Sequence, residues 1–108
     1  MDTKALLLLT TLKDLSQAKT LSQKLLDKKL AACVSLLPGL SSHYVWQGQL
    51  EEEKECLLLI KSTNQHWEAL EEFLQQEHPY KCPEILAFET EKVSSTYLDW
   101  LLGSLKTS

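Results

Sequence analysis

Seven consecutive residues, from His78 to Glu84, carry an imidazole, a thiol and a carboxylate in one short segment. His78, Cys82 and Glu84 supply these groups, and all three types are common ligands for borderline divalent metals such as copper and zinc. Pro79 and Pro83 fix their own φ angles and push the preceding residues toward extended conformations. The segment is therefore predicted to form a rigid corner on which three ligands could share one metal ion.

Other interpretations of this segment stay open. The same spacing is typical of a stiff turn that joins a helix ending near His78 to a strand beginning near Glu84. A salt bridge from Glu84 to Lys61 would make the carboxylate a structural anchor, and His78 would then need a ligand from a neighbouring subunit. Cys33 or Cys82 could also be a nucleophile with His78 as its base. Because no Gly-rich oxyanion turn or third orienting residue is recognisable, we expect no enzymatic activity.

The composition narrows the class of protein. A chain of 108 residues is long enough for one hydrophobic core, so we expect a single domain over residues 1–108. No segment approaches the roughly 20 apolar residues that cross a bilayer, and the first residues lack the pattern of a signal peptide. We therefore expect a cytoplasmic protein without a membrane partner.

Charge and cysteine content exclude two further classes. The net charge is −4 and the chain contains no arginine, which removes the usual bidentate contacts to phosphates and base edges. A nucleic-acid partner is not expected. The three cysteines are odd in number and form no Cys-x-x-Cys pair, so neither a disulfide framework nor a zinc knuckle is indicated. We expect reduced thiols.

The first half of the chain predicts a strand, a helix and a long hairpin. Residues 4–11 hold a short apolar run typical of a strand covered on both faces. Asp14 or Ser16 can cap the following helix. Its apolar half is formed by leucines and one alanine: Leu15, Ala18, Leu21, Leu25, Leu26 and Leu30. Residues 31–62 show no helical period, and Gln47-Gly48-Gln49 divides them into two arms, as in a hairpin.

The predicted hairpin is longer than a compact domain of this size. Its arms would extend about 45–50 Å, whereas a domain of about 100 residues is roughly 35 Å across. Pro38-Gly39 interrupts the first arm and predicts a bulge or bend. An overhanging ribbon with Tyr44, Val45 and Trp46 would expose strand edges and apolar surface. We therefore expect an oligomer in which a partner chain covers this ribbon.

The second half predicts a helix, a strand and a last helix. Thr63 or Asn64 can cap a helix whose apolar positions are Trp67, Leu70, Phe73 and Leu74. Residues 85–90 form a strand, and Ser94 or Ser95 opens a helix that Gly103 is placed to stop. The predicted fold class is α+β, a ferredoxin-like β-α-β-β-α-β sandwich with a long hairpin between its second and third strands and a C-terminal helix.

Motifs spread over nearly the whole chain resemble those of the CutA family, the divalent-cation-tolerance proteins. The motifs are Leu30-Ala31-Ala32-Cys33-Val34, Pro38-Gly39, Tyr44-Val45-Trp46-Gln47-Gly48, residues 55–61, His78-Pro79-Tyr80, Pro83-Glu84 and Tyr97-Leu98-Asp99-Trp100. The resemblance implies a homotrimer of ferredoxin-like subunits with hairpins crossing between them. It also implies an association with copper and other divalent metals.

The family pattern can be carried over residue by residue. It matches Cys33, Tyr44, Trp46, Glu55, Lys61, His78, Tyr80, Glu84, Tyr97 and Trp100. Some bacterial members have cysteines where this chain has Thr10 and Phe73, so two soft ligands are missing. Cys82 stands where the family has mostly aliphatic or polar residues. These departures argue against a dedicated copper(I) thiolate site and leave His78 and Glu84 for Cu²⁺ or Zn²⁺.

The sequence therefore supports two alternative hypotheses about function. The first is a trimeric, cytoplasmic protein that binds copper or zinc through His78, Cys82, Glu84 and Cys33. The second is a regulatory trimer of the architecture seen in PII signalling proteins, with a small anion bound in a cleft between subunits. Lys61 would bind that anion beside Tyr44 and Trp46. The further residues of this cleft would be Glu55, Tyr80, Tyr97 and Trp100.

Overall fold

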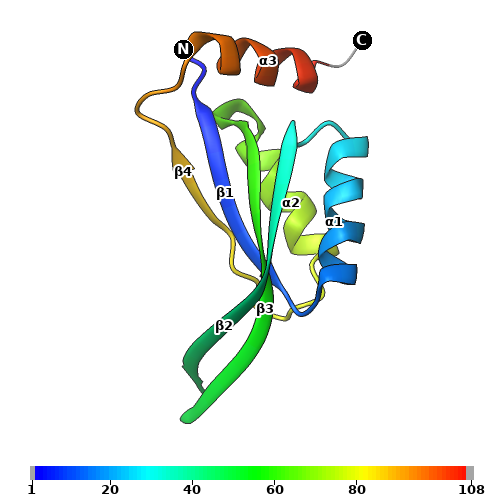
Figure 1. The fold of residues 1–108 in the computed structure, drawn as a ribbon, viewed down its shortest axis with the longest axis vertical. Coiled ribbons are helices and arrows are strands. Elements are labelled where there is room, and N and C mark those ends of the chain that lie inside the picture. Colours follow the sequence, from blue (N-terminus) through cyan, green and yellow to red (C-terminus); the bar gives the residue numbers. More distant parts are fainter. Residues whose placement is uncertain (1, 107–108) are drawn as a thin grey trace.

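The computed structural model describes residues 2–106, which form a four-stranded antiparallel sheet and three α-helices (Figure 1). Along the sheet the strand order is β2-β3-β1-β4. A short 3₁₀ turn over Asn64–His66 leads into the second helix. The elements are β1 (Ala5–Leu12), α1 (Leu15–Asp27), β2 (Cys33–Trp46), β3 (Gln49–Thr63), α2 (Trp67–Glu77), β4 (Leu86–Glu89) and α3 (Ser95–Leu105). This arrangement confirms the predicted ferredoxin-like α+β fold.

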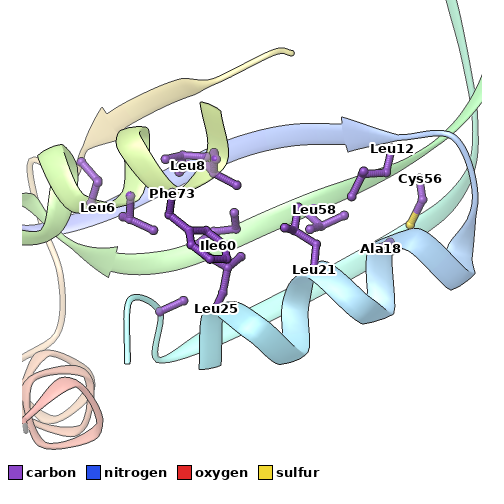
Figure 2. Packing of buried hydrophobic residues seen from close by; sticks show 13 residues of the cluster. Leu6, Leu8, Leu12, Ala18, Leu21, Leu25, Cys56, Leu58, Ile60 and Phe73 are labelled. Carbon is purple, nitrogen blue, oxygen red and sulfur yellow. The ribbon is translucent and has the colours of Figure 1, made fainter. Parts of the chain in front are cut away.

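The core lies between one face of the sheet and the helices α1 and α2 (Figure 1). Because side chains alternate along a strand, every second residue of β1 and β3 points to this face. Figure 2 shows these side chains packed against those of the two helices. The buried hydrophobic residues of this core include Leu6, Leu8, Leu12, Ala18, Leu21, Leu25, Cys56, Leu58, Ile60, Leu70, Phe73 and Leu74.

Two of the three helices, α1 and α3, begin at capping side chains that the sequence predicted. The Asp14 carboxylate accepts a hydrogen bond of 2.8 Å from the Gln17 backbone N–H, and the Ser94 hydroxyl caps α3 in the same way. Three expectations were wrong in detail. Neither Thr63 nor Asn64 caps α2, because a 3₁₀ turn over Asn64–His66 comes first and α2 begins at Trp67 without a side-chain cap. Leu15 and Leu26 are each 39% exposed, because both lie at the margin of the buried stripe of α1. Gly103 lies inside α3 and does not end it.

The hairpin of β2 and β3 projects beyond the helices and gives the molecule a long axis of 45 Å (Figure 1). This confirms the predicted overhang. Leu37 pairs with Leu57 but Leu40 pairs with Glu55, so β2 holds one extra residue at Pro38-Gly39. Gly39 has a φ of 81°, a left-handed conformation that glycine adopts without steric cost.

The sheet face away from α1 and α2 is apolar and largely uncovered, and we call it the open sheet face. Phe88, Leu37 and Leu86 on this face are 54%, 52% and 51% exposed. Helix α3 packs against one end of it, around Ala5. From the strand pairing, the leucines of the open sheet face are Leu7, Leu9, Leu37, Leu57, Leu59 and Leu86.

No helix within residues 2–106 is long and apolar enough to cross a membrane.

Candidate functional site

A hollow of about 620 Å³ opens where the hairpin leaves the body of the sheet. One wall is the hairpin and the other is the loop that follows α2. The hollow brings Cys82 and Glu84, two of the predicted metal ligands, together with Tyr44, Trp46, Glu55 and Tyr80 from the predicted cleft. The remaining lining residues are Thr11, Ser42, His43 and Lys81.

Glu55 and Tyr80 join the two walls of the hollow. The Tyr80 hydroxyl donates a hydrogen bond of 2.7 Å to Oε2 of Glu55, and the Glu55 side chain is buried. Burial raises the pKa of Tyr80, and its hydrogen bond to the Glu55 carboxylate raises that pKa further. Tyr80 therefore stays a neutral donor that holds the Glu55 carboxylate in place.

Glu84 faces the same hollow as Glu55. Loss of solvation at its carboxyl group raises the pKa of Glu84, and the negative charge of Glu55 raises it further. The two carboxylates are thus close enough to repel each other. Within residues 2–106 Glu84 makes no salt bridge with Lys61, so the structural anchor considered from the sequence is absent from this part of the chain.

His78 does not line the hollow and is only 6% exposed. Its Nε2–H donates to the carbonyl oxygen of Thr11 at 2.8 Å, and its Nδ1 accepts from the backbone N–H of Tyr80 at 3.1 Å. The Tyr80 ring packs edge-on against the imidazole of His78, with 4.7 Å between the two ring centroids. Burial is the main influence on His78 and lowers its pKa, against smaller opposing effects of Thr11 and Glu55.

Both ring nitrogens of His78 are therefore engaged in hydrogen bonds within the chain. Metal coordination by His78 would require one of these bonds to break, and so would its action as a general base for Cys82. The arrangement instead ties the loop after α2 to the end of β1. Pro79 holds His78 in the extended conformation that the sequence predicted, with φ −73° and ψ 133°.

The other predicted site residues form a second group near α3. The Lys61 ammonium lies 3.8 Å from Sγ of Cys33 and makes a short hydrogen bond to the hydroxyl of Ser35. The ring centroids of Tyr97 and Trp100 on α3 lie 5.8 Å apart, with the ring planes tilted by 31°. Lys61 and Glu55 are six residues apart on β3, a distance of about 20 Å along the strand. Within one chain, the predicted cleft is thus divided into two groups.

The residues 2–106 contain no group of three or more His, Cys, Asp or Glu side chains close enough together to hold a metal ion. A complete metal site at this hollow would therefore need further ligands, either water molecules or side chains of a second subunit. The sequence interpretation missed Thr11, whose backbone carbonyl holds His78. No sequence signal marks it, because a carbonyl group is present at every residue.

Comparisons with known proteins agree with this architecture. The family model described as "CutA1 divalent ion tolerance protein" matches residues 6–104. A divalent-cation tolerance protein CutA of Yersinia pestis (strain Pestoides F) is 45% identical over 101 residues, which cover 94% of this chain and 85% of the relative.

Solved structures agree as well. The crystal structure of the divalent ion tolerance protein CutA1 from Ehrlichia chaffeensis is similar with a TM-score of 0.94 and 26% identity, covering 99% of this chain and all of that one. The periplasmic divalent cation tolerance protein CutA from Archaeoglobus fulgidus gives a TM-score of 0.90 and 27% identity over 94% of this chain and 99% of its own. This chain therefore belongs to the CutA1 divalent ion tolerance family.

Proposed function

We propose that this chain assembles into a homotrimer and binds a divalent borderline metal, copper or zinc, at the hollow beside Glu55 and Glu84. The observation that carries this proposal is the pair of neighbouring carboxylates, with the thiol of Cys82 lining the same hollow. Membership in a divalent ion tolerance family supports a role in metal tolerance.

The chemistry of the hollow suits a divalent cation. Two carboxylates that repel each other would both be stabilised in their ionised form by a cation between them. Carboxylate oxygens and a thiolate together are ligands that zinc and copper accept. Water molecules or side chains of a second subunit would complete the coordination.

The open sheet face supports the trimer. On this face the side chains of Leu37, Leu86 and Phe88 are each about half exposed to solvent. On the hairpin beyond it, Val45 and Leu50 are more exposed than these three. Covering such a surface with copies of the same chain would remove apolar area from water at about 25 cal/mol per Å². Lys61 lies away from Tyr44 and Trp46 within the chain, so the small-anion alternative requires a cleft that a second subunit completes.

Calorimetric titration with Zn²⁺ and with Cu²⁺ tests the metal site. We expect Glu55→Gln, Glu84→Gln and Cys82→Ser each to weaken binding roughly tenfold or more, because each removes a ligand. Glu68→Gln is the matched control: it removes an exposed carboxylate of α2 that lies outside the hollow. If Glu55→Gln and Glu84→Gln both bind the metal with unchanged affinity, the proposal is wrong.

His78→Gln separates this site from one built on the imidazole. Glutamine can donate to Thr11 and accept from Tyr80 but is a poor metal ligand. We expect the folded His78→Gln protein to bind metal with the affinity of the unmodified chain. Loss of binding in this variant alone would show that His78 leaves its hydrogen bonds and coordinates the ion.

We place the protein in the cytoplasm. The cysteines Cys33, Cys56 and Cys82 are all unpaired, as is usual where glutathione and thioredoxin keep thiols reduced. Fractionation of cells that express the untagged protein would test this, and recovery in a periplasmic fraction would contradict it.

A further inference from the structure

Cys33 and Lys61 face each other directly across two neighbouring strands. They are partners in the register of β2 and β3, where opposite side chains on one face have Cβ atoms about 4.5–5.5 Å apart. Both side chains lie on the face opposite the helices α1 and α2. Their proximity is therefore fixed by the sheet and does not depend on the conformation of a loop.

The side chains make direct contact. Nζ of Lys61 lies 3.8 Å from Sγ of Cys33, and Ser35, two residues further along β2, holds the same amine through its hydroxyl. Lys61 makes no salt bridge with any carboxylate in the part of the chain that the structure describes. A nucleophilic nitrogen is thus held beside a thiol, with no acidic group competing for it there.

Within a single chain the thiol is partly exposed. Cys33 is half-buried, whereas Cys56, on the helix side of the sheet, is buried. Tyr97 of α3 borders this group: burial raises its pKa, and the charge of the nearby Cys33 raises it further. Cys33 is therefore partly exposed in the single chain and lies beside Lys61, which also contacts Ser35.

We propose that Cys33 and Lys61 form an oxidation-sensitive pair that peroxide converts to a covalent sulfur–nitrogen bond. This inference is independent of the metal site, because none of these residues lines the hollow. The bond would join β2 to β3 across the sheet, on the open sheet face.

The reaction has two balanced steps. Hydrogen peroxide oxidises the Cys33 thiolate by two electrons to the sulfenic acid, and the peroxide is reduced to water. Lys61 then loses a proton to solvent, and its amine attacks the sulfenic sulfur. The S–N bond forms, the S–O bond breaks, and the oxygen leaves as water. Ring closure of this kind is known for a sulfenic acid and a backbone nitrogen.

Mass spectrometry of the full-length protein after treatment with hydrogen peroxide tests the proposal. A Cys56→Ser, Cys82→Ser background leaves Cys33 as the only thiol, so no intramolecular disulfide can form. We expect a monomeric product two hydrogens lighter than the reduced chain and a cross-linked peptide pair that contains Cys33 and Lys61. Trypsin should no longer cleave after Lys61, and an excess of dithiol should restore the original mass.

Two variants of Lys61 make the test specific. Lys61→Met and Lys61→Arg, the latter retaining the positive charge, should abolish the lighter product, and Cys33 should gain oxygen instead. Lys54→Met is the matched control, because Lys54 is also on β3 but pairs with Ser41. The proposal is wrong if Cys33 is oxidised to sulfinic acid while trypsin still cleaves after Lys61. It is also wrong if the product two hydrogens lighter forms in Lys61→Met.

Discussion

His78 shows how one side chain can join two parts of the chain that are distant in sequence. Its imidazole connects Thr11, at the end of β1, to Tyr80, in the loop after α2, through one donated and one accepted hydrogen bond. Tyr80 in turn reaches Glu55 on β3. These hydrogen bonds hold the loop against the sheet, and the loop carries Cys82 and Glu84 to the hollow.

We predict that His78→Ala lowers the free energy of unfolding by about 2–3 kcal/mol, because it leaves the Thr11 carbonyl and the Tyr80 N–H without their partner. Urea denaturation followed by circular dichroism measures this difference. His43→Ala is the matched control, since His43 is exposed on the hairpin and should change stability by less than about 0.5 kcal/mol. Equal losses in the two variants would contradict the structural role of His78.

The lowered pKa of His78 predicts a pH dependence of stability. Between this lowered value and 6.5, the unfolded chain binds more protons than the folded chain, so the free energy of unfolding falls as pH falls through this window. The contribution is fully present above 6.5. His78→Gln should reduce the slope between about pH 7.5 and 5.5 in urea denaturation.

Two other groups affect the same titration. Burial lowers the pKa of His66 as well, so part of the slope should remain in His78→Gln. The pKa of Glu84 is raised above 4.5, so the folded chain binds more protons there and this group acts with the opposite sign at lower pH. A slope unchanged by His78→Gln would show that the imidazole titrates alike in the folded and unfolded chains.

At the scale of elements, the bulge in β2 decides which side chains the hairpin presents. Before the bulge, Cys33 and Leu37 lie on the open sheet face; after it, Tyr44 and Trp46 share the face of Glu55. Without the extra residue, the hairpin would turn these two aromatic rings away from the hollow.

We predict opposite effects of alanine at two glycines. Gly39→Ala should destabilise the protein by roughly 1–2 kcal/mol, because its left-handed conformation is unfavourable for a residue with a Cβ atom. Gly103→Ala should stabilise it by about 0.5–1 kcal/mol, because this residue is helical and a Cβ there meets no atom within 4 Å. Thermal unfolding of both variants checks this, and a stabilised Gly39→Ala would contradict the bulge geometry.

At the scale of the whole molecule, the open sheet face and the hollow meet at the base of the hairpin. Leu57 belongs to the open sheet face, and Glu55, two residues away on the same strand, lines the hollow. Assembly through this face would therefore bring a second chain close to the proposed ligands.

We predict that Phe88→Asp converts the proposed trimer to smaller species, because it places a charge at a largely exposed aromatic position of the open sheet face. Sedimentation velocity at micromolar concentration measures the distribution. The control Leu26→Asp changes a leucine on α1, which lies on the other side of the sheet, and should leave the trimer intact. If the unmodified chain sediments as a monomer, the assembly proposal is wrong.

The order of the elements and the overhanging hairpin could be predicted because periodicity, capping residues and Gln47-Gly48-Gln49 are local signals. The role of His78 could not, because its partners are a backbone carbonyl from β1 and a backbone N–H, which leave no mark on residue type. The sequence also could not show that Lys61 lies far from Tyr44 and Trp46 within one chain. Their distance depends on the strand register, which the sequence alone did not specify.

The bulge and the turn together restrict how the hairpin can vary in length between related chains. Side chains alternate, so adding one residue to each arm would exchange the inner and outer side chains between that point and the turn. Adding two residues to each arm preserves them. Relatives that keep aromatic rings in the places of Tyr44 and Trp46 should therefore differ in hairpin length only by even numbers of residues in each arm.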